Sequence, residues 1–230
     1  MTDQNKTENL KTQPSGSSRM IATMGSVGLL AGVLLVVTFQ ITFPFIEANR
    51  AELLERSIFE VIPDATQKAV YTKTEADKLA LLGEQDESPF RLYTGYDDQN
   101  KLRGVAVEAQ GQGFQDVLRI IYGYSPDCEC IVGMKVLESK ETPGLGDKIE
   151  KDARFRANFD ALDVRLTPDE NQLLNPVVLV KKGQKTEKWQ VEAITGATIS
   201  SRAIATIINQ SSQTIVPLIR KNIGILEEGQ

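Results

Sequence analysis

Four consecutive residues, Thr195-Gly196-Ala197-Thr198, combine a flexible turn with two hydroxyl groups. The β-branched residues before them predict a strand, and the periodic apolar residues after them predict a helix. Glycine lets the backbone turn sharply and leaves room for a ligand, and a helix N-terminus attracts phosphate. Thr198, Ser200 and Ser201 can each serve as a helix N-cap. The motif therefore fits either an anion site or a capped strand–turn–helix joint.

The composition limits the chemistry that the chain can perform without a cofactor. It has 230 residues, a formal net charge of −5 and no histidine. The missing histidine excludes a Ser-His-Asp triad, a Cys-His pair and histidine-ligated metals or haem. No carboxylate spacing indicates a hydrolase, so we assign no catalytic residue and no metal ligand. Two cysteines are too few for a four-cysteine metal site, so redox chemistry requires an organic cofactor.

The segment Thr195-Gly196-Ala197-Thr198-Ile199-Ser200 resembles the Ser/Thr-Gly-Ala-Thr-x-Ser/Thr signature of the FMN-binding domain family. In that family the second threonine carries FMN through a phosphodiester. The resemblance implies a covalent FMN on Thr198, with Thr195, Gly196, Ala197 and Ser200 around it. The family usually has Asp three residues before the first Ser/Thr, where this chain has Glu192. If the enzyme that attaches FMN recognises this position strictly, attachment of FMN is expected to be slower.

A second segment, Glu141-Thr142-Pro143-Gly144-Leu145-Gly146, resembles the Glu-Thr-Pro-Gly-Leu-Gly loop of the same family. Its proline and two glycines predict a defined loop. In the family this loop forms one wall of the isoalloxazine site, which implies that Leu145 contacts the ring. The following Asp147-Lys148-Ile149 is more similar to the G subunit of Rnf ion-translocating oxidoreductases than to the C subunit of sodium-translocating NADH:quinone reductase. Two motifs in the family's order are more specific than either alone.

Residues 20–46 contain no charged side chain and predict a transmembrane helix. Such a helix is roughly 40 Å long at about 1.5 Å per residue, enough to cross a hydrocarbon core of about 30 Å. The run is too long for a signal peptide and lacks a small-residue cleavage site. Pro44 predicts the end of the helix. Residues 1–19 are polar and predict a disordered tail, and their basic residues favour a cytoplasmic N-terminus.

The remaining residues predict an α+β fold, with one FMN-binding domain after the membrane helix. We expect a helical linker region at 47–89, which starts with an amphipathic helix, then the FMN-binding domain at 90–222 and a loose tail at 223–230. The residue pattern does not decide between helix and loop at 79–82. Strands are predicted at 102–108, 116–124, 130–138, 175–181 and 189–193, with a hairpin turn at 182–185, and helices at 147–159 and 199–220.

Cys128 and Cys130 lie two positions apart at the start of a predicted strand, so their side chains point to the same face. A disulfide between them requires strain, although oxidation is plausible outside the cytoplasm. We interpret them as two surface thiols, with the strained disulfide as the alternative.

The resemblance implies a membrane-anchored flavoprotein subunit of an Rnf-type complex, which couples electron flow between NADH and ferredoxin to ion movement. Expected partners are the other membrane subunits, a flavin transferase during maturation and membrane lipid, with no nucleic acid. The main domain is expected on the extracytoplasmic side of the cytoplasmic membrane. The alternatives are a component similar to the C subunit of sodium-translocating NADH:quinone reductase, or an anchored non-redox domain in which Thr198 is only a helix cap.

Overall fold

The structure, a computed structural model, describes residues 16–74, 77–83 and 88–228. The chain divides into two compact units, 1–50 and 51–230. The predicted disordered tail lies outside the described residues as far as position 15, and so do the last two residues of the predicted C-terminal tail.

Helix α1 (Gly16–Val61) is 46 residues long and contains a stretch apolar enough to cross a membrane. It starts at Gly16, so the end of the predicted tail is helical. Pro44 lies inside the helix, and our prediction that the helix ends there is wrong. Proline removes one backbone hydrogen bond, but the following Ala51-Glu52-Leu53-Leu54 are strong helix formers and the helix continues.

The described residues build a seven-stranded antiparallel sheet in the order β2-β1-β3-β4-β5-β6-β7. The mixed helix and sheet architecture confirms the predicted α+β class. The strands are β1 (Gln67–Lys73), β2 (Leu79–Leu81), β3 (Leu92–Tyr96), β4 (Leu102–Gln112), β5 (Val117–Ser125), β6 (Cys130–Glu138) and β7 (Leu162–Asp163). A separate parallel pair joins β8 (Val178–Val180) to β9 (Gln190–Glu192).

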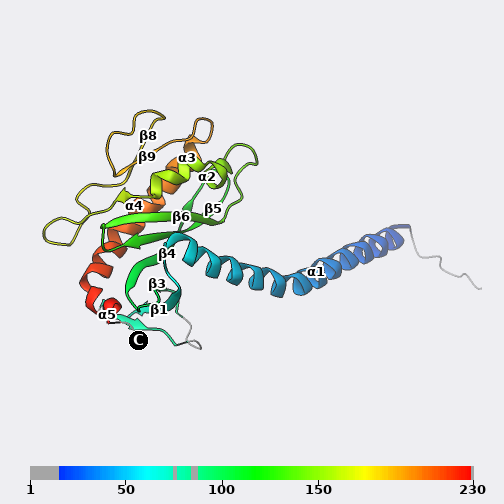
Figure 1. The fold of residues 1–230 in the computed structure, drawn as a ribbon. Coiled ribbons are helices and arrows are strands. Elements are labelled where there is room, and N and C mark those ends of the chain that lie inside the picture. The colour runs from blue at the N-terminus through cyan, green and yellow to red at the C-terminus, as the bar shows by residue number, and fades with distance from the viewer. Residues whose placement is uncertain (1–15, 75–76, 84–87, 229–230) are drawn as a thin grey trace, which may run out of the picture. The chain divides into compact units, whose positions relative to one another are not determined.

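Both faces of the sheet are buried under other elements, and successive strand residues contribute to opposite faces. On one face, Val105 and Val107 belong to a large core with helix α4 (Thr198–Lys221), whose buried residues include Ile204 and Ile208. Figure 1 shows α4, in orange and red, running along the sheet. On the other face, Ala106 belongs to a second core cluster, defined below.

The second cluster joins the last turn of α1 to the sheet and contains Ile58, Val61, Ile62, Tyr93, Ala106 and Ile121. Glycines on neighbouring strands make room for the helix end. A Cβ atom on Gly123 would lie 1.9 Å from the Val61 carbonyl oxygen, and one on Gly133 would lie 3.0 Å from the Val61 Cα. Gly123 and Gly133 are paired across β5 and β6. The end of α1 can therefore approach the sheet this closely only because Gly123 and Gly133 have no side chains.

Several predicted boundaries differ from the structure. The stretch 47–89, predicted as a helical linker, also contains β1 and β2, because the edge of the sheet takes up its short apolar pieces. The predicted helix at 147–159 is broken into α2 (Lys148–Lys151), α3 (Ala153–Arg156) and a 3₁₀ turn (Ala157–Phe159). The break falls at Asp152, which is extended and caps α3 through hydrogen bonds from Arg154 N and Phe155 N.

Two connections also differ. The predicted hairpin at 182–185 does not join antiparallel strands, because β8 and β9 run parallel and the loop crosses over between them. The predicted loose tail contains α5 (Ile223–Glu227), and Leu226 within it is fully buried. The Tyr96 hydroxyl donates a hydrogen bond of 2.8 Å to the Leu226 carbonyl. An apolar residue and a buried acceptor therefore anchor this segment to the domain.

Cys128 and Cys130 form a disulfide, so the interpretation as two thiols is wrong. The Cα atoms are 5.2 Å apart, within the usual range for a bridge. Glu129 between them has a φ of 50°, a left-handed conformation that a regular strand does not contain. This local turn at the β5–β6 connection brings the two sulfur atoms together.

Candidate functional site

The Thr195–Thr198 segment connects β9 to α4 by a sharp turn. Gly196 has a φ of 85°, and a Cβ atom there would meet no atom within 4 Å. Thr195, Gly196 and Thr198 are exposed, while Ala197 is buried. The turn therefore presents backbone and two hydroxyl groups to an open surface.

Thr198 is the first residue of the 24-residue helix α4. The cap position belongs to Ala197, and the helix has no side-chain cap hydrogen bond, so our expectation of a Thr198, Ser200 or Ser201 N-cap is wrong. Ser201 stabilises the turn in another way: its hydroxyl accepts from Ile194 N and donates to the Ala197 carbonyl. Within the described part of the chain, the Thr198 hydroxyl makes no hydrogen bond. The fold leaves this nucleophilic oxygen unused.

The 141–146 loop is an ordered turn that presents one apolar side chain. Leu145 N and Asp147 N both donate to the Thr142 carbonyl, at 3.1 and 3.4 Å. Gly144 has a φ of 78°, which favours glycine there. Leu145 is 52% exposed, and Pro143 beside it is also exposed. An exposed leucine on a hydrogen-bonded loop is suited to contact a flat ligand.

Glu141 connects this loop to the start of α4 and is only 5% exposed. One carboxylate oxygen accepts hydrogen bonds from Phe114 N at 2.7 Å and Gln115 N at 3.1 Å. The other accepts from the Ser200 hydroxyl at 2.5 Å. We call this arrangement the Glu141 clasp, because one buried carboxylate joins three chain segments.

The clasp requires glycine on both sides. A Cβ atom on Gly113 or on Gly146 would lie 2.5 Å from a Glu141 carboxylate oxygen. Side chains at positions 113 and 146 would therefore displace the Glu141 carboxylate that joins the two motifs. Since Glu141 and Ser200 point into the protein, they hold the motifs in place, whereas Thr198 and Leu145 point outward.

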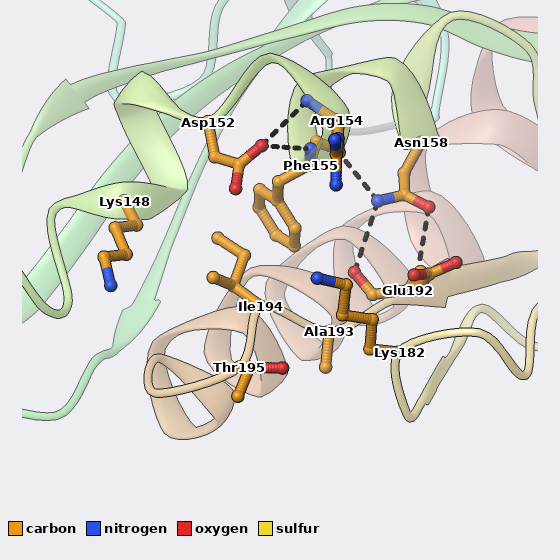
Figure 2. A pocket seen from close by; sticks show the side chains of 10 residues that line it. All are labelled: Lys148, Asp152, Arg154, Phe155, Asn158, Lys182, Glu192, Ala193, Ile194 and Thr195. Carbon is orange, nitrogen blue, oxygen red and sulfur yellow. Dashed lines mark hydrogen bonds between the residues drawn. The ribbon is translucent and has the colours of Figure 1, made fainter.

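A cavity of about 340 Å³ is lined by Thr195 of the first motif and, just after the second motif, by Lys148. Thr195 and Ile194 line it from the turn before α4, and Lys148 lines it from α2, where its backbone N–H donates to the Leu145 carbonyl. Figure 2 shows these side chains with Phe155, Arg154 and Lys182 around the same space. The cavity has an apolar floor and polar edges, as small-molecule sites commonly do.

Neighbouring groups shift the pKa values of two charged side chains near the cavity. A hydrogen bond from the Lys151 ammonium lowers the pKa of Asp147 below its usual range. Burial lowers the pKa of Lys185, although the Glu192 carboxylate opposes this effect. Lys185 Nζ also donates to Asn158 Oδ1 at 3.2 Å, and Asn158 bonds both backbone groups of Glu192. This network fixes β9, the strand that leads into the turn.

The two sequence motifs, far apart in the chain, meet at the Glu141 clasp. The predicted residues Thr195, Gly196, Thr198, Pro143 and Leu145 lie on the accessible side. The exposed hydroxyl, the open space at both turn glycines and the cavity fit an FMN group attached at Thr198. Residue patterns did not indicate Phe114, Arg154 or Lys182 as residues of the site.

Comparison with known proteins adds independent observations. The FMN-binding domain family matches residues 113–213. The G subunit of the ion-translocating oxidoreductase complex of Methanosarcina acetivorans is 30% identical over 195 residues, covering 84% of this chain and 92% of the relative. The G subunit of the Na(+)-translocating ferredoxin:NAD(+) oxidoreductase complex of Acetobacterium woodii is 25% identical, covering 81% of this chain and 86% of the relative.

Among solved structures, Shewanella oneidensis NqrC has the same fold. Its crystal structure superposes with a TM-score of 0.56 at 20% identity, covering 74% of this chain and 88% of that chain. At this identity the likeness concerns the fold alone.

Proposed function

Because the chain belongs to the FMN-binding domain family, among the G subunits of ion-translocating oxidoreductase complexes, we propose that it carries one covalent FMN on Thr198 and relays electrons within such a complex. It is an Rnf-type electron-transport subunit and acts as part of the complex, with no catalysis of its own. When bound, FMN supplies the redox chemistry that this histidine-free chain lacks.

The observation that carries the attachment site is the state of the Thr198 hydroxyl. It is exposed, makes no hydrogen bond in the described part of the chain and stands at the first position of a long helix. The helix dipole favours the negative charge that a phosphodiester keeps. In the attachment step, the threonine oxygen replaces AMP on the flavin phosphorus of FAD, so the pyrophosphate bond breaks and the hydroxyl proton is released. A separate flavin transferase with magnesium would catalyse it.

The chain's own residues would then hold the attached group in one orientation. Gly196 lets the backbone approach the phosphate closely, with Thr195 and Ala197 completing the turn. The Leu145 side chain and the backbone of Thr142, Pro143 and Gly144 form one wall of the ring site. Glu141, Gly146 and Ser200 keep this wall at a fixed position relative to Thr198, through the clasp described above.

The protein is membrane-anchored, since α1 contains a stretch long and apolar enough to span a bilayer and the relatives are subunits of ion-translocating complexes. We expect its partners to be the other membrane subunits and the surrounding lipid. We place the domain after the span on the extracytoplasmic side. The Cys128–Cys130 disulfide supports this side, because disulfides persist in oxidising compartments.

The alternative functions have less support. In a non-redox domain Thr198 would serve only as a helix cap, but Ala197 occupies the cap position and no side chain caps α4. A role like that of the C subunit of a sodium-translocating NADH:quinone reductase rests on a fold shared at 20% identity. By contrast, sequence similarity to the G subunit of Methanosarcina acetivorans extends over most of both chains.

The test is the intact mass and in-gel fluorescence of the full-length protein from a host that expresses the flavin transferase. We expect the sequence mass plus one FMN less one water. Thr198→Val keeps the side-chain shape and removes the oxygen, so bound flavin should disappear while folding is retained. Thr195→Val is the matched control and should retain the flavin. Persistent fluorescence in Thr198→Val, or flavin on a peptide without Thr198, would refute the assignment.

A further inference from the structure

Three cationic side chains meet at the cavity beside the two motifs. Lys148 comes from α2, Arg154 from α3 and Lys182 from the loop between β8 and β9. Within the described residues, none of the three forms an ion pair. Unpaired cations from three elements around one cavity are unexpected in a chain with a net charge of −5, so they point to an anionic ligand.

The two carboxylates at the cavity do not neutralise this charge. Asp152 uses one oxygen to accept from Arg154 N and Phe155 N at the start of α3. Glu192 faces a further cation, Lys185, whose ammonium it stabilises. The cations therefore outnumber the carboxylates, and the cavity keeps a positive charge.

The residues that line the cavity favour a ring with one polar edge. Its floor is apolar, because the side chains of Phe155 and Ile194 line it; these residues are only 2% and 8% exposed. The cavity lies next to Thr195 but does not include Thr198, and its α2 side is hydrogen-bonded to the Leu145 carbonyl. A group that is tethered at Thr198 and contacts Leu145 would therefore reach the cavity with its far end.

We propose that this cavity binds the pyrimidine edge of the FMN ring, and that Lys148, Arg154 and Lys182 stabilise the negative charge which that edge gains on reduction. The inference rests on the proposed attachment of FMN to Thr198. Positive groups near this edge favour the reduced ring over the oxidised ring. The three side chains thus set the flavin midpoint potential and bind no separate substrate.

The experiment measures the midpoint potential of the full-length flavinylated protein by spectroelectrochemistry. Lys182→Gln and Arg154→Gln remove charge from exposed side chains, so the fold should be retained, as the thermal unfolding midpoint will show. We expect each substitution to lower the potential by about 30 mV, which corresponds to a tenfold loss in stability of the reduced form in a two-electron couple. Lys182→Arg should restore the potential.

Lys181→Gln is the matched control, because Lys181 is exposed and adjacent but does not line the cavity. An unchanged potential in both cavity variants, or an equal fall in Lys181→Gln, would overturn the inference. If the cations bound the phosphodiester instead, the ³¹P resonance would move and the potential would not, which also overturns it. In-gel fluorescence precedes each titration: a protein without flavin on Thr198 contradicts the proposed function and, with it, this inference.

Discussion

Residues of the two motifs have different tasks, as a comparison of Glu141 and Ser200 with Thr198 shows. Both belong to segments that resemble the flavin motifs, yet both are buried and satisfy each other, with a hydrogen bond of 2.5 Å. Thr198 lies two positions from Ser200 and has the opposite character, since it is exposed and unbonded within the described residues. At this scale the motif separates into groups that hold the site together and groups that face the ligand.

Ser200→Ala should destabilise the protein, because it leaves a buried carboxylate oxygen of Glu141 without its donor. The expected loss in the free energy of unfolding is about 1–3 kcal/mol. The measurement is denaturant unfolding of the detergent-solubilised, flavin-free chain. Thr198→Ala removes a hydroxyl from the same helical turn and should change stability by less than about 0.5 kcal/mol. Equal losses in the two variants would contradict the clasp.

Leu145→Ala should alter the flavin and leave its attachment intact. The leucine is 52% exposed on an ordered loop, so it contributes little to the core and should contact the ring. We expect a changed absorbance spectrum or midpoint potential, with full in-gel fluorescence. Leu174→Ala, at a similarly exposed leucine (48%) outside the two motifs, is the control. Identical spectra and potentials for Leu145→Ala and the unsubstituted protein would remove the loop from the site.

At the scale of elements, the sheet is fitted to two helices in different ways. Branched side chains of β4 and β5 pack against α4, whereas glycines receive the end of α1. Ion pairs border the second contact: Lys68 bonds Glu55 at 2.6 Å, and Lys135 bonds Glu60. The glycine positions therefore determine how closely the end of α1 approaches.

Gly123→Ala tests this fit. The added methyl group would lie 1.9 Å from the Val61 carbonyl oxygen, so the helix end must move away from the sheet. We expect a loss of about 3 kcal/mol or more, the upper end for overpacked cores, by denaturant unfolding. Gly224→Ala, where a Cβ atom meets nothing within 4 Å, is the control and should not destabilise. Unchanged stability of Gly123→Ala would mean that the end of α1 can move away from the sheet without loss of stability.

Sequence patterns predicted the longest elements well: α4, β5 and β6 to within one residue at each end, and β4 except for its last four residues. They failed where a tertiary contact decides. The parallel pairing of β8 and β9, the break at Asp152 and the burial of Leu226 all depend on distant partners. Likewise the motifs led to the proposed attachment residue and ring loop, but not to the cationic cavity, whose members lie on three separate elements.

At the scale of the whole molecule, α1 is continuous across the boundary between the two compact units, so one helix contains both the membrane span and the first residues of the domain. An electron carrier tethered to its own protein cannot diffuse away, which suits a compartment without free FMN. This logic depends on the side of the membrane that the domain faces. Two features of the chain bear on that side: the basic residues around the span and the disulfide at the β5–β6 connection.

We predict that the C-terminal domain is extracytoplasmic. Lys6, Lys11 and Arg19 precede the span, and positive residues favour the cytoplasmic side. A reporter that is active only in the cytoplasm should be inactive when fused after Gln230 and active when fused before Met1. As a second measurement, Cys128 and Cys130 should resist alkylation in protein from intact cells until a reductant is added. An active C-terminal fusion together with freely alkylated cysteines would reverse the topology, because a cytoplasmic domain needs neither a disulfide nor a tether against loss of FMN.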